Sequence, residues 1–339
     1  MPRNQGVITC AGSSGRGVER FITAGMPVVD VSNWEPSRHI PAITNDDEAA
    51  GVLAADHLLG LGHHHFAYAG LKKGVYSQRR GDGFCRRLAQ EGHKVERFLL
   101  YEGKNVGGQW VNQIECTKAW LLGLPKPCGL LVCADQDAMH VSQIAQSVSI
   151  AMPDEIAMVG VDDDDLVCVL AHPPLTSVRT DGVGVGMASA QTLDRMLSTS
   201  EMQPAKRLAP LGVTVRASTE GRPIADPVVR AAVAWLRIRA AGEASMEDCA
   251  RAAGVSLRTL QVRCARFLGH GPAEELLRLR LEHAARLLAE SDLPLKAVAH
   301  RTGFASASYL CTAFSRERGM TPGSWRKKHQ EGQVTAMSA

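Results

Sequence analysis

The sequence predicts an α/β body with an open, doubly wound parallel sheet, followed by a smaller domain made only of helices. Through residues 1–217, compact apolar runs of strand length alternate with stretches of helical periodicity. Beyond residue 227 the strand signals end. The charge changes at the same place: residues 1–225 contain 21 Lys and Arg against 24 Asp and Glu, whereas residues 226–339 contain 17 against 11. A mildly acidic body with a basic domain is typical of a chain in which one part contacts nucleic acid.

Six apolar runs predict the strands of the body. They lie at residues 6–10, 27–31, 65–70, 98–101, 129–134 and 156–161. None alternates with polar residues, as expected for a parallel sheet that is covered on both faces. Helical spacing predicts helices between them, at residues 46–61, 80–91, 113–122 and 137–147. Asn45 is the expected N-cap of the first helix and Gly62 its expected C-cap.

Three segments that follow predicted strands are unusually polar, at residues 77–84, 135–137 and 162–165. Ligands of open parallel sheets lie beyond the carboxyl ends of the strands. Carboxylates and an Arg in that position can hold a polyhydroxyl ligand, because each sugar hydroxyl both donates and accepts hydrogen bonds. Strand ends are also polar where they are merely solvated, so the spacing alone leaves both interpretations open.

Five motifs occur in order over this body. They are HLLGLGH (residues 57–63), SQRRGDGF (77–84), ADQDA (134–138), PDEI followed by GVDD (153–163), and PPLTSV (173–178). This order resembles the periplasmic-binding-protein-like sensor domain of LacI-type repressors and of xylose operon regulators, although Ala134 stands where Asn is usual. The resemblance implies parallel sheets in two lobes, with a crossover near the last motif. It also implies effector contacts at Arg80 and Asp162, with Asp135 as a weaker third.

One departure concerns the start of the domain, which we assign to residues 1–220. The resemblance implies that a complete domain opens with a further strand–helix–strand–helix unit, and residues 6–10 match its third strand. We therefore expect an incomplete first lobe with apolar sheet edges. A misassigned start and a degenerate lobe remain alternative explanations.

The last third begins after a Pro-rich linker, expected at residues 221–227, and contains an internal repeat. Ala250-x-x-x-Gly254 recurs as Ala299-x-x-x-Gly303, each followed by a further helical segment and a Gly. A small residue before a turn glycine lets two helices cross closely, with Gly supplying the positive φ. The following helix can then enter the DNA major groove. Two such units in series in a basic domain predict a DNA-binding domain.

Residues 228–330 are assigned to this domain and residues 331–339 to a flexible tail. Segments 280–288, 295–304, 308–316 and 319–326 resemble the DNA-binding domain of AraC/XylS-type regulators, with Cys264 and Leu310 where Phe is more usual and where we expect core packing. Arg and Gln suit bidentate contacts with guanine and adenine, and further Arg side chains suit phosphates. The predicted DNA contacts are Leu257, Arg258, Thr259, Gln261, Val262, Arg263, Arg266, Ser306, Ala307, Ser308, Thr312 and Arg316.

Other functional classes find little support. The nine cysteines are scattered without a C-x-x-C, and no apolar run approaches about 18 residues, the length that spans a membrane. Neither a signal peptide nor a phosphate-binding Gly-rich loop is present. Adjacent histidines at 63–65 cannot all face one metal ion, and the glycines at 182, 184 and 186 fit a plain loop. We expect a cytoplasmic protein with no metal, no cofactor and no catalytic residues.

The two resemblances together imply a sequence-specific transcription regulator that responds to a sugar, with D-xylose as first choice, and that activates xylose-utilisation genes. The expected partners are an operator in double-stranded DNA, the sugar and a second copy of the chain, with RNA polymerase as a candidate. Two alternatives remain: a regulator whose degenerate sensor serves only for dimerisation, and a sugar-binding or sugar-modifying protein that does not bind DNA.

Overall fold

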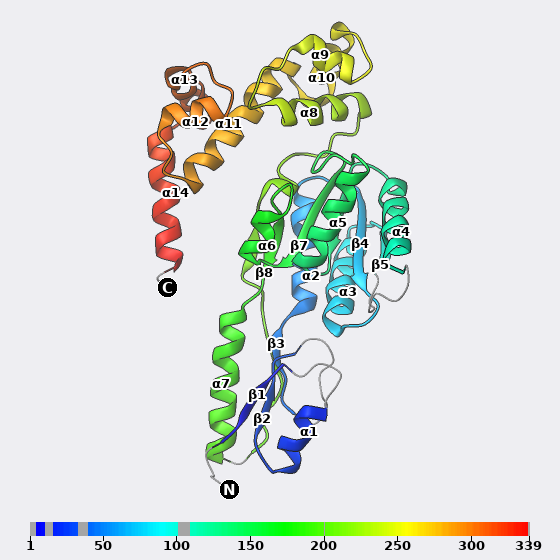
Figure 1. The fold of residues 1–339 in the computed structure, drawn as a ribbon, viewed down its shortest axis with the longest axis vertical. Coiled ribbons are helices and arrows are strands. Elements are labelled where there is room, and N and C mark those ends of the chain that lie inside the picture. Colours follow the sequence, from blue (N-terminus) through cyan, green and yellow to red (C-terminus); the bar gives the residue numbers. More distant parts are fainter. Residues whose placement is uncertain (1–4, 11–15, 33–39, 101–108, 200, 338–339) are drawn as a thin grey trace. The chain divides into compact units, whose positions relative to one another are not determined.

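The computed structural model describes residues 5–10, 16–32, 40–100, 109–199 and 201–337. The chain divides into two compact units, Met1–Pro223 and Ile224–Ala339. The first unit has two α/β lobes, and the second contains only helices among its described residues (Figure 1). We describe each unit by itself.

The larger lobe of the first unit is built on a six-stranded sheet in the order β10-β8-β7-β6-β4-β5. The strands are β4 (His65–Leu71), β5 (Val95–Leu100), β6 (Cys128–Val132), β7 (Ile156–Asp162), β8 (Thr176–Arg179) and β10 (Gly212–Thr214). All neighbours are parallel except β10, which pairs antiparallel with β8. The predicted strands at residues 65–70, 129–134 and 156–161 thus form its centre, as the doubly wound pattern requires.

Helices cover both faces of this sheet, which explains why its strands are uniformly apolar. They are α2 (Asp47–Gly60), α3 (Val75–Gln90), α4 (Gln109–Gly123), α5 (Asp135–Ser147) and α6 (Asp165–Leu170). Along β4, Ala67 and Ala69 pack in the core on the side of α4 and α5. The alternate residues Phe66 and Tyr68 pack on the side of α2 and α3. Successive strand side chains point to opposite faces, so a strand buried on both sides needs apolar residues at every position.

The smaller lobe contains two short parallel pairs of strands. β1 (Val7–Thr9) pairs with β2 (Val28–Asp30), and β3 (Ile43–Asn45) pairs with β9 (Lys206–Leu208). The helices α1 (Arg16–Thr23) and α7 (Gly182–Thr199) complete it, and Val29, Ile43, Val185 and Ala188 form a small core. The chain crosses between the lobes after β3, after β8 and after β9. The crossover after β8 follows directly on the segment 173–178.

The helical unit has two small cores that α11 (Pro272–Glu290) joins. The first core packs α8 (Pro227–Arg239), α9 (Met246–Ala252) and α10 (Leu257–Leu268) against the first part of α11. The second packs α12 (Leu295–Arg301), α13 (Ala307–Arg318) and α14 (Pro322–Met337) against its second part. Each core thus belongs to one copy of the internal repeat.

Two local predictions are wrong. The N-cap of α2 is Asp46, whose carboxylate accepts a hydrogen bond from Ala49 N, and not Asn45. The glycines at 182, 184 and 186 begin helix α7 and do not form a loop, because the Asp181 carboxylate caps its first turn by accepting from Gly184 N (2.8 Å). Helix α14 continues to Met337, and the flexibility expected for residues 331–339 stays a prediction.

Candidate functional site

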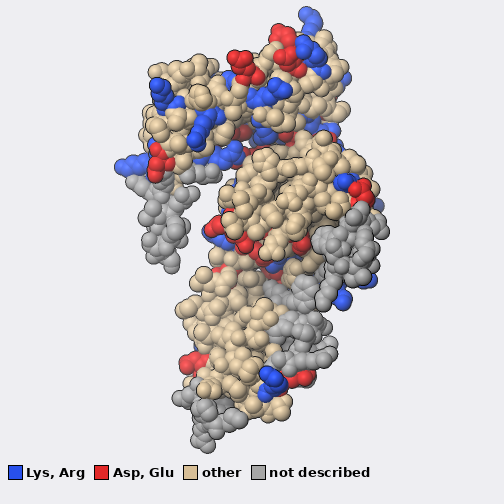
Figure 2. Space-filling view, viewed as in Figure 1, with Lys and Arg blue, Asp and Glu red and all other residues tan. Residues whose placement is uncertain are grey.

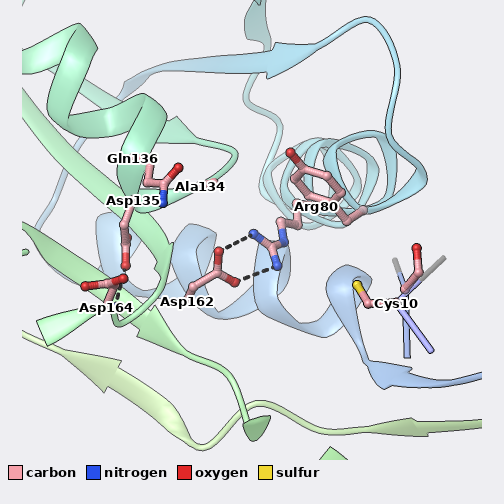
Figure 3. A pocket seen from close by; sticks show the side chains of 9 residues that line it. Cys10, Arg80, Ala134, Asp135, Gln136, Asp162 and Asp164 are labelled. Carbon is pink, nitrogen blue, oxygen red and sulfur yellow. Dashed lines mark hydrogen bonds and ion pairs between the residues drawn. The ribbon is translucent and has the colours of Figure 1, made fainter. Parts of the chain in front are cut away.

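A cavity of about 370 Å³ lies at the carboxyl ends of the central strands of the larger lobe. Most of its walls come from the segments that follow β6 and β7 and from the first turns of α3, whereas Cys10 and Ser32 follow β1 and β2 of the smaller lobe. The lining residues are Cys10, Ser32, Tyr76, Arg80, Ala134, Asp135, Gln136, Asp162 and Asp164 (Figure 3). The volume suits a ligand of monosaccharide size, since small-molecule pockets begin at about 300 Å³.

Arg80 of α3 is fixed in the cavity by two carboxylates and a backbone carbonyl. Its Nε donates to Asp47 Oδ1 (2.9 Å), its Nη2 to Asp162 Oδ1 (2.8 Å) and its Nη1 to Cys133 O (2.6 Å). The side chain is 4% exposed and that of Asp47 1% exposed. Burial raises the pKa of Asp47, although the Arg80 guanidinium opposes this. Arg80 also lies over the Tyr76 ring, 5.0 Å from its centroid.

Asp162 ends strand β7 and faces Arg80 (Figure 3). Unlike Asp47, it is 44% exposed and retains free acceptor capacity toward the cavity. A carboxylate oxygen has two lone pairs, and a sugar hydroxyl can donate to one while it accepts from a guanidinium N–H. The structure therefore brings together the two residues that the sequence analysis puts first as effector contacts.

Asp135 also lines the cavity, but its two oxygens already have partners within the protein. Oδ1 accepts from Ser177 Oγ (2.6 Å), and Oδ2 accepts from Asp164 N (2.9 Å) and Cys168 Sγ (3.3 Å). Burial raises its pKa to about 6, and the hydrogen bonds from Ser177 and Asp164 N oppose that rise. These contacts hold the loop that carries Asp162, so the geometry supports a role for Asp135 in shaping the cavity. A direct contact with the effector stays a prediction.

The residues of the segment SQRRGDGF (77–84) have three different roles in helix α3. Ser77 Oγ accepts from Leu71 N (2.8 Å) and ties the start of α3 to the end of β4. Arg80 enters the cavity one turn later. Gly83 lies against α2, since a Cβ atom there would stand 2.1 Å from Glu48 O, and Phe84 is completely buried. The spacing therefore serves helix packing as well as the cavity.

Several lining residues were not predicted from the sequence. Tyr76 precedes the motif by one position and could have been found with it. Ser32 and Cys10 follow the strands of the smaller lobe, and the same strand-end rule that selected Asp162 could have pointed to them. Gln136 and Asp164 lie within segments that were recognised as polar but not singled out.

The helical unit contains two helix-turn-helix motifs of matching construction. In the first, Ser256 Oγ accepts from Thr259 N (3.2 Å) and caps α10, and in the second Ser306 Oγ accepts from Tyr309 N (3.1 Å) and caps α13. The turn residues Gly254 and Gly303 have φ of +72° and +77°. L-residues with a Cβ rarely adopt this conformation, which explains the repeated glycine.

The interior of each motif is equally repeated. Ala250 and Ala299, four positions before the turn glycines, are each 2% exposed. Cys264 and Leu310, which replace the more usual Phe, are 1% and 0% exposed. The expectation that both belong to the core is confirmed, and their smaller volume leaves the motif intact.

The predicted DNA contacts fall into two groups. The predicted contacts that are exposed are Arg258, Thr259, Gln261, Val262, Arg266, Ser306, Ser308, Thr312 and Arg316. Leu257 and Ala307 are half-buried and pack against the two cores. Arg263 makes an ion pair with Asp226 (2.8 Å), the residue that caps α8, so part of its charge is already engaged. Ser256 and Ser306 are engaged as caps.

Tyr309 is an exposed residue of α13 that the sequence analysis missed. Its side chain is 52% exposed, and its ring packs edge-on against Phe304. Its position on the second helix of the motif is the signal that could have selected it, since an exposed aromatic residue is unusual there. Figure 2 shows Lys and Arg side chains spread over this unit, as expected for a surface that attracts the phosphate backbone.

Among the described residues, no group of His, Cys, Asp and Glu could hold a metal ion. No helix in the described part of the chain is long and apolar enough to cross a membrane.

Comparison with known proteins separates the same two parts. A periplasmic binding protein-like domain matches residues 55–219, and a helix-turn-helix domain matches residues 249–328. The xylose operon regulatory protein of Haemophilus influenzae is 27% identical over 293 residues, covering 85% of this chain and 75% of that protein. A putative AraC-like transcription regulator of Streptomyces antibioticus is 44% identical over 104 residues, covering 31% of this chain and 34% of that protein.

The solved structure of a xylose-binding transcription activator has the same fold. It matches with a TM-score of 0.83 at 24% identity, over 95% of this chain and 86% of that chain. The related proteins are transcription regulators and not enzymes. This chain thus contains a periplasmic binding protein-like domain followed by a helix-turn-helix domain, and over most of its length it is similar to xylose operon regulatory proteins.

Proposed function

We propose that the chain is a transcription regulator that binds double-stranded DNA through its helix-turn-helix motifs and a sugar through the cavity at Arg80 and Asp162, with D-xylose as the first choice. The single observation that supports the sugar site is the ion pair of Arg80 with Asp162 in a cavity of about 370 Å³. The Arg80 guanidinium is buried and held in place by the protein, whereas the Asp162 carboxylate is half-exposed. The names of the related proteins support D-xylose.

The proposed mechanism is a population shift. A sugar that hydrogen-bonds to Arg80 and Asp162 of the larger lobe, and to the strand ends at Cys10 and Ser32 of the smaller lobe, favours the closed form of the sensor unit. If two copies of the chain associate, closure changes how their helix-turn-helix motifs are presented to DNA. The coupling free energy of such responses is typically about 1–3 kcal/mol.

We further propose that the regulator acts in the cytoplasm as a homodimer, that it activates xylose-utilisation genes and that RNA polymerase is its partner at the promoter. The domain boundaries, with a sensor at residues 1–220 and a DNA-binding domain at residues 228–330, stay predictions that limited proteolysis can test.

A calorimetric titration of the full-length chain with D-xylose tests the sugar site. Saturable binding at one site per chain is expected, together with weaker or no binding of L-arabinose and D-ribose under the same conditions. An absence of heat with D-xylose across the millimolar range would contradict the assignment. Sequence-specific DNA binding without any sugar effect would then favour a regulator whose sensor serves only for dimerisation, whereas no DNA binding at all would favour a sugar-binding protein with a structural helical unit.

A further inference from the structure

The loop that presents Asp162 to the cavity has an unfavourable backbone conformation. Asp162 and Asp163 have φ of +118° and +57°, and among the described residues other than glycine only Ser149 also has a positive φ. Side chains with a Cβ adopt this region only where the surroundings over-determine it, and such outliers cluster at ligand sites and switches. The contacts that hold these two residues are therefore informative.

Asp163 does not line the cavity, and its carboxylate is tied to the last part of the sensor unit. Its Oδ2 accepts from Thr214 Oγ1 (2.6 Å), and its Oδ1 accepts from Arg216 Nη1 (2.8 Å). The Asp163 and Arg216 side chains are only 8% and 15% exposed. Arg216 Nη1 also donates to Leu175 O (3.0 Å), so the guanidinium joins the loop after β7 to the segment before β8.

The residues that follow Arg216 continue this attachment. Arg216 N donates to Thr176 Oγ1 (2.8 Å), and Ser218 Oγ donates to Met158 O of β7 (2.6 Å). Thr219 Oγ1 lies 2.8 Å from Thr176 Oγ1. Segment 214–219 is thus hydrogen-bonded to β7 and β8. Residues 220–223 then connect it to Ile224, where the helical unit begins.

We propose that Asp163 and Arg216 are positioning residues of the sugar response, which couple the loop of Asp162 to segment 214–219 and so to the chain that enters the DNA-binding unit. This inference rests on the proposed function. A sugar that bonds to Arg80 and Asp162 changes the hydrogen bonds that hold the Asp162 carboxylate, and any change at Asp162 passes to the adjacent Asp163. Because Asp163 holds Arg216 through a nearly buried ion pair, segment 214–219 follows. The ion pair therefore transmits the signal without touching the sugar.

The test compares full-length variants with D-xylose and with a DNA fragment that the wild-type chain selects from a random-sequence pool. Asp163→Asn and Arg216→Gln each remove one charge of the pair. We expect the Kd for D-xylose and the sugar-free Kd for DNA to stay within about threefold of wild type. For a coupled system, the Kd for DNA typically differs about 5–150-fold between samples with and without D-xylose. In both variants this ratio should fall to below 2.

Two further variants separate signalling from folding. Arg216→Lys keeps the charge, so its ratio of DNA Kd values should lie between that of Arg216→Gln and that of wild type. Thr214→Val removes a single hydrogen bond and should lower this ratio with little change in Tm. Arg207→Gln, at an exposed position of β9, is the matched control and should respond as wild type does.

A sugar response of wild-type size in Asp163→Asn, Arg216→Gln and Thr214→Val would overturn the inference. The inference would also be overturned if D-xylose binding in these variants weakened in parallel with a fall in Tm, because the Asp163–Arg216 pair would then act only in folding. A wild-type chain that fails to bind D-xylose would instead refute the proposed function, and the inference with it. The wild-type titration alone distinguishes that failure from the others.

Discussion

The sensor unit and the helical unit expose their functional side chains in opposite ways. In the sensor, Arg80 is buried and bonded to three protein groups before any ligand arrives, and its partner Asp47 is 1% exposed. In the helical unit, Arg258, Gln261 and Arg266 are exposed on one helix and have no comparable anchoring. A small ligand is recognised by groups fixed in advance, which lowers the entropy cost of binding. The long side chains of the helical unit can still adjust to a base edge or a phosphate.

The same contrast appears in how each region is assembled. The sensor site joins residues separated by more than a hundred positions, such as Ser32 and Asp162, whereas each helix-turn-helix motif is complete within a short stretch of sequence. Substitutions of the buried residues that line the sensor cavity should therefore affect folding and binding together. Substitutions of the exposed residues on α10 and α13 should affect DNA binding alone.

The largest effect is expected for Arg80→Ala. It should abolish the response to D-xylose and lower the free energy of unfolding by about 3–5 kcal/mol, because Asp47 is left buried without its partner. Sugar-free DNA binding should persist. Calorimetry and denaturant unfolding measure the two losses. Arg86→Ala, which removes an exposed ion pair with Glu48 from the same helix, should cost about 0.5 kcal/mol or less. An unchanged sugar affinity in Arg80→Ala would contradict the site.

Asp135→Asn should change the pH dependence of stability. Burial raises the pKa of Asp135 to about 6 in the folded chain, against about 3.9 in the unfolded chain. The folded state therefore holds a proton that the unfolded state has lost, and stability should fall as pH rises from about 4 to about 6. A rise of about two units in the pKa of Asp135 corresponds to roughly 3 kcal/mol in the free energy of unfolding.

Denaturant unfolding of wild type and Asp135→Asn at several pH values between 4 and 7 checks this. The variant should lose roughly 3 kcal/mol less than wild type over that range. Parallel profiles would show that Asp135 does not titrate in the way its burial implies.

Arg258→Ala and Gln261→Ala should each relax base preference on DNA by about 1–3 kcal/mol, because both are exposed and suited to bidentate base contacts. Ser308→Ala and Thr312→Ala on α13 should cost less, since their short hydroxyls reach less far and Thr312 Oγ1 already donates to Ser308 O (3.1 Å). Selection of DNA from a random pool by each variant measures the preference. Retained preference in both α10 variants would count against α10 as a base-reading helix.

The smallest effect is expected for Arg266→Ala and Arg316→Ala, which should weaken binding alike on all sequences. Each should reduce the slope of log Kd against log salt by about 1, since each is expected to neutralise one phosphate. Arg263→Ala is a matched comparison, because its ion pair with Asp226 leaves less charge for a phosphate. A salt slope that stays at the wild-type value in all three variants would show that other cations carry the phosphate contacts.

The sequence predicted the elements whose signal is local. The strands β4, β6 and β7 are long apolar runs, and the repeat around Gly254 and Gly303 fixes both turns by residue type and spacing. The meeting of Arg80 and Asp162 followed from the rule that ligands lie at the carboxyl ends of parallel strands and from the family resemblance.

Features that depend on distant partners could not be predicted. Strands β3 and β9 have three residues each, and Ile43 pairs with Lys206 far along the chain. Helix α7 begins with glycines, and only the Asp181 cap and the burial of Val185 and Ala188 explain it. The bonds that Asp135 accepts from Ser177 and Asp164 N come from segments far along the chain and could not be predicted, whereas its direct contact with the effector stays a prediction.

The most direct test of the central claim is the affinity of the full-length chain for its selected DNA fragment, measured by fluorescence anisotropy with and without saturating D-xylose. We expect salt-dependent, sequence-specific binding whose Kd changes by at least about fivefold when D-xylose is added. An equal change with L-arabinose would point to a broader sugar specificity. A Kd that is the same with and without D-xylose would contradict the claim that this chain is a sugar-responsive regulator.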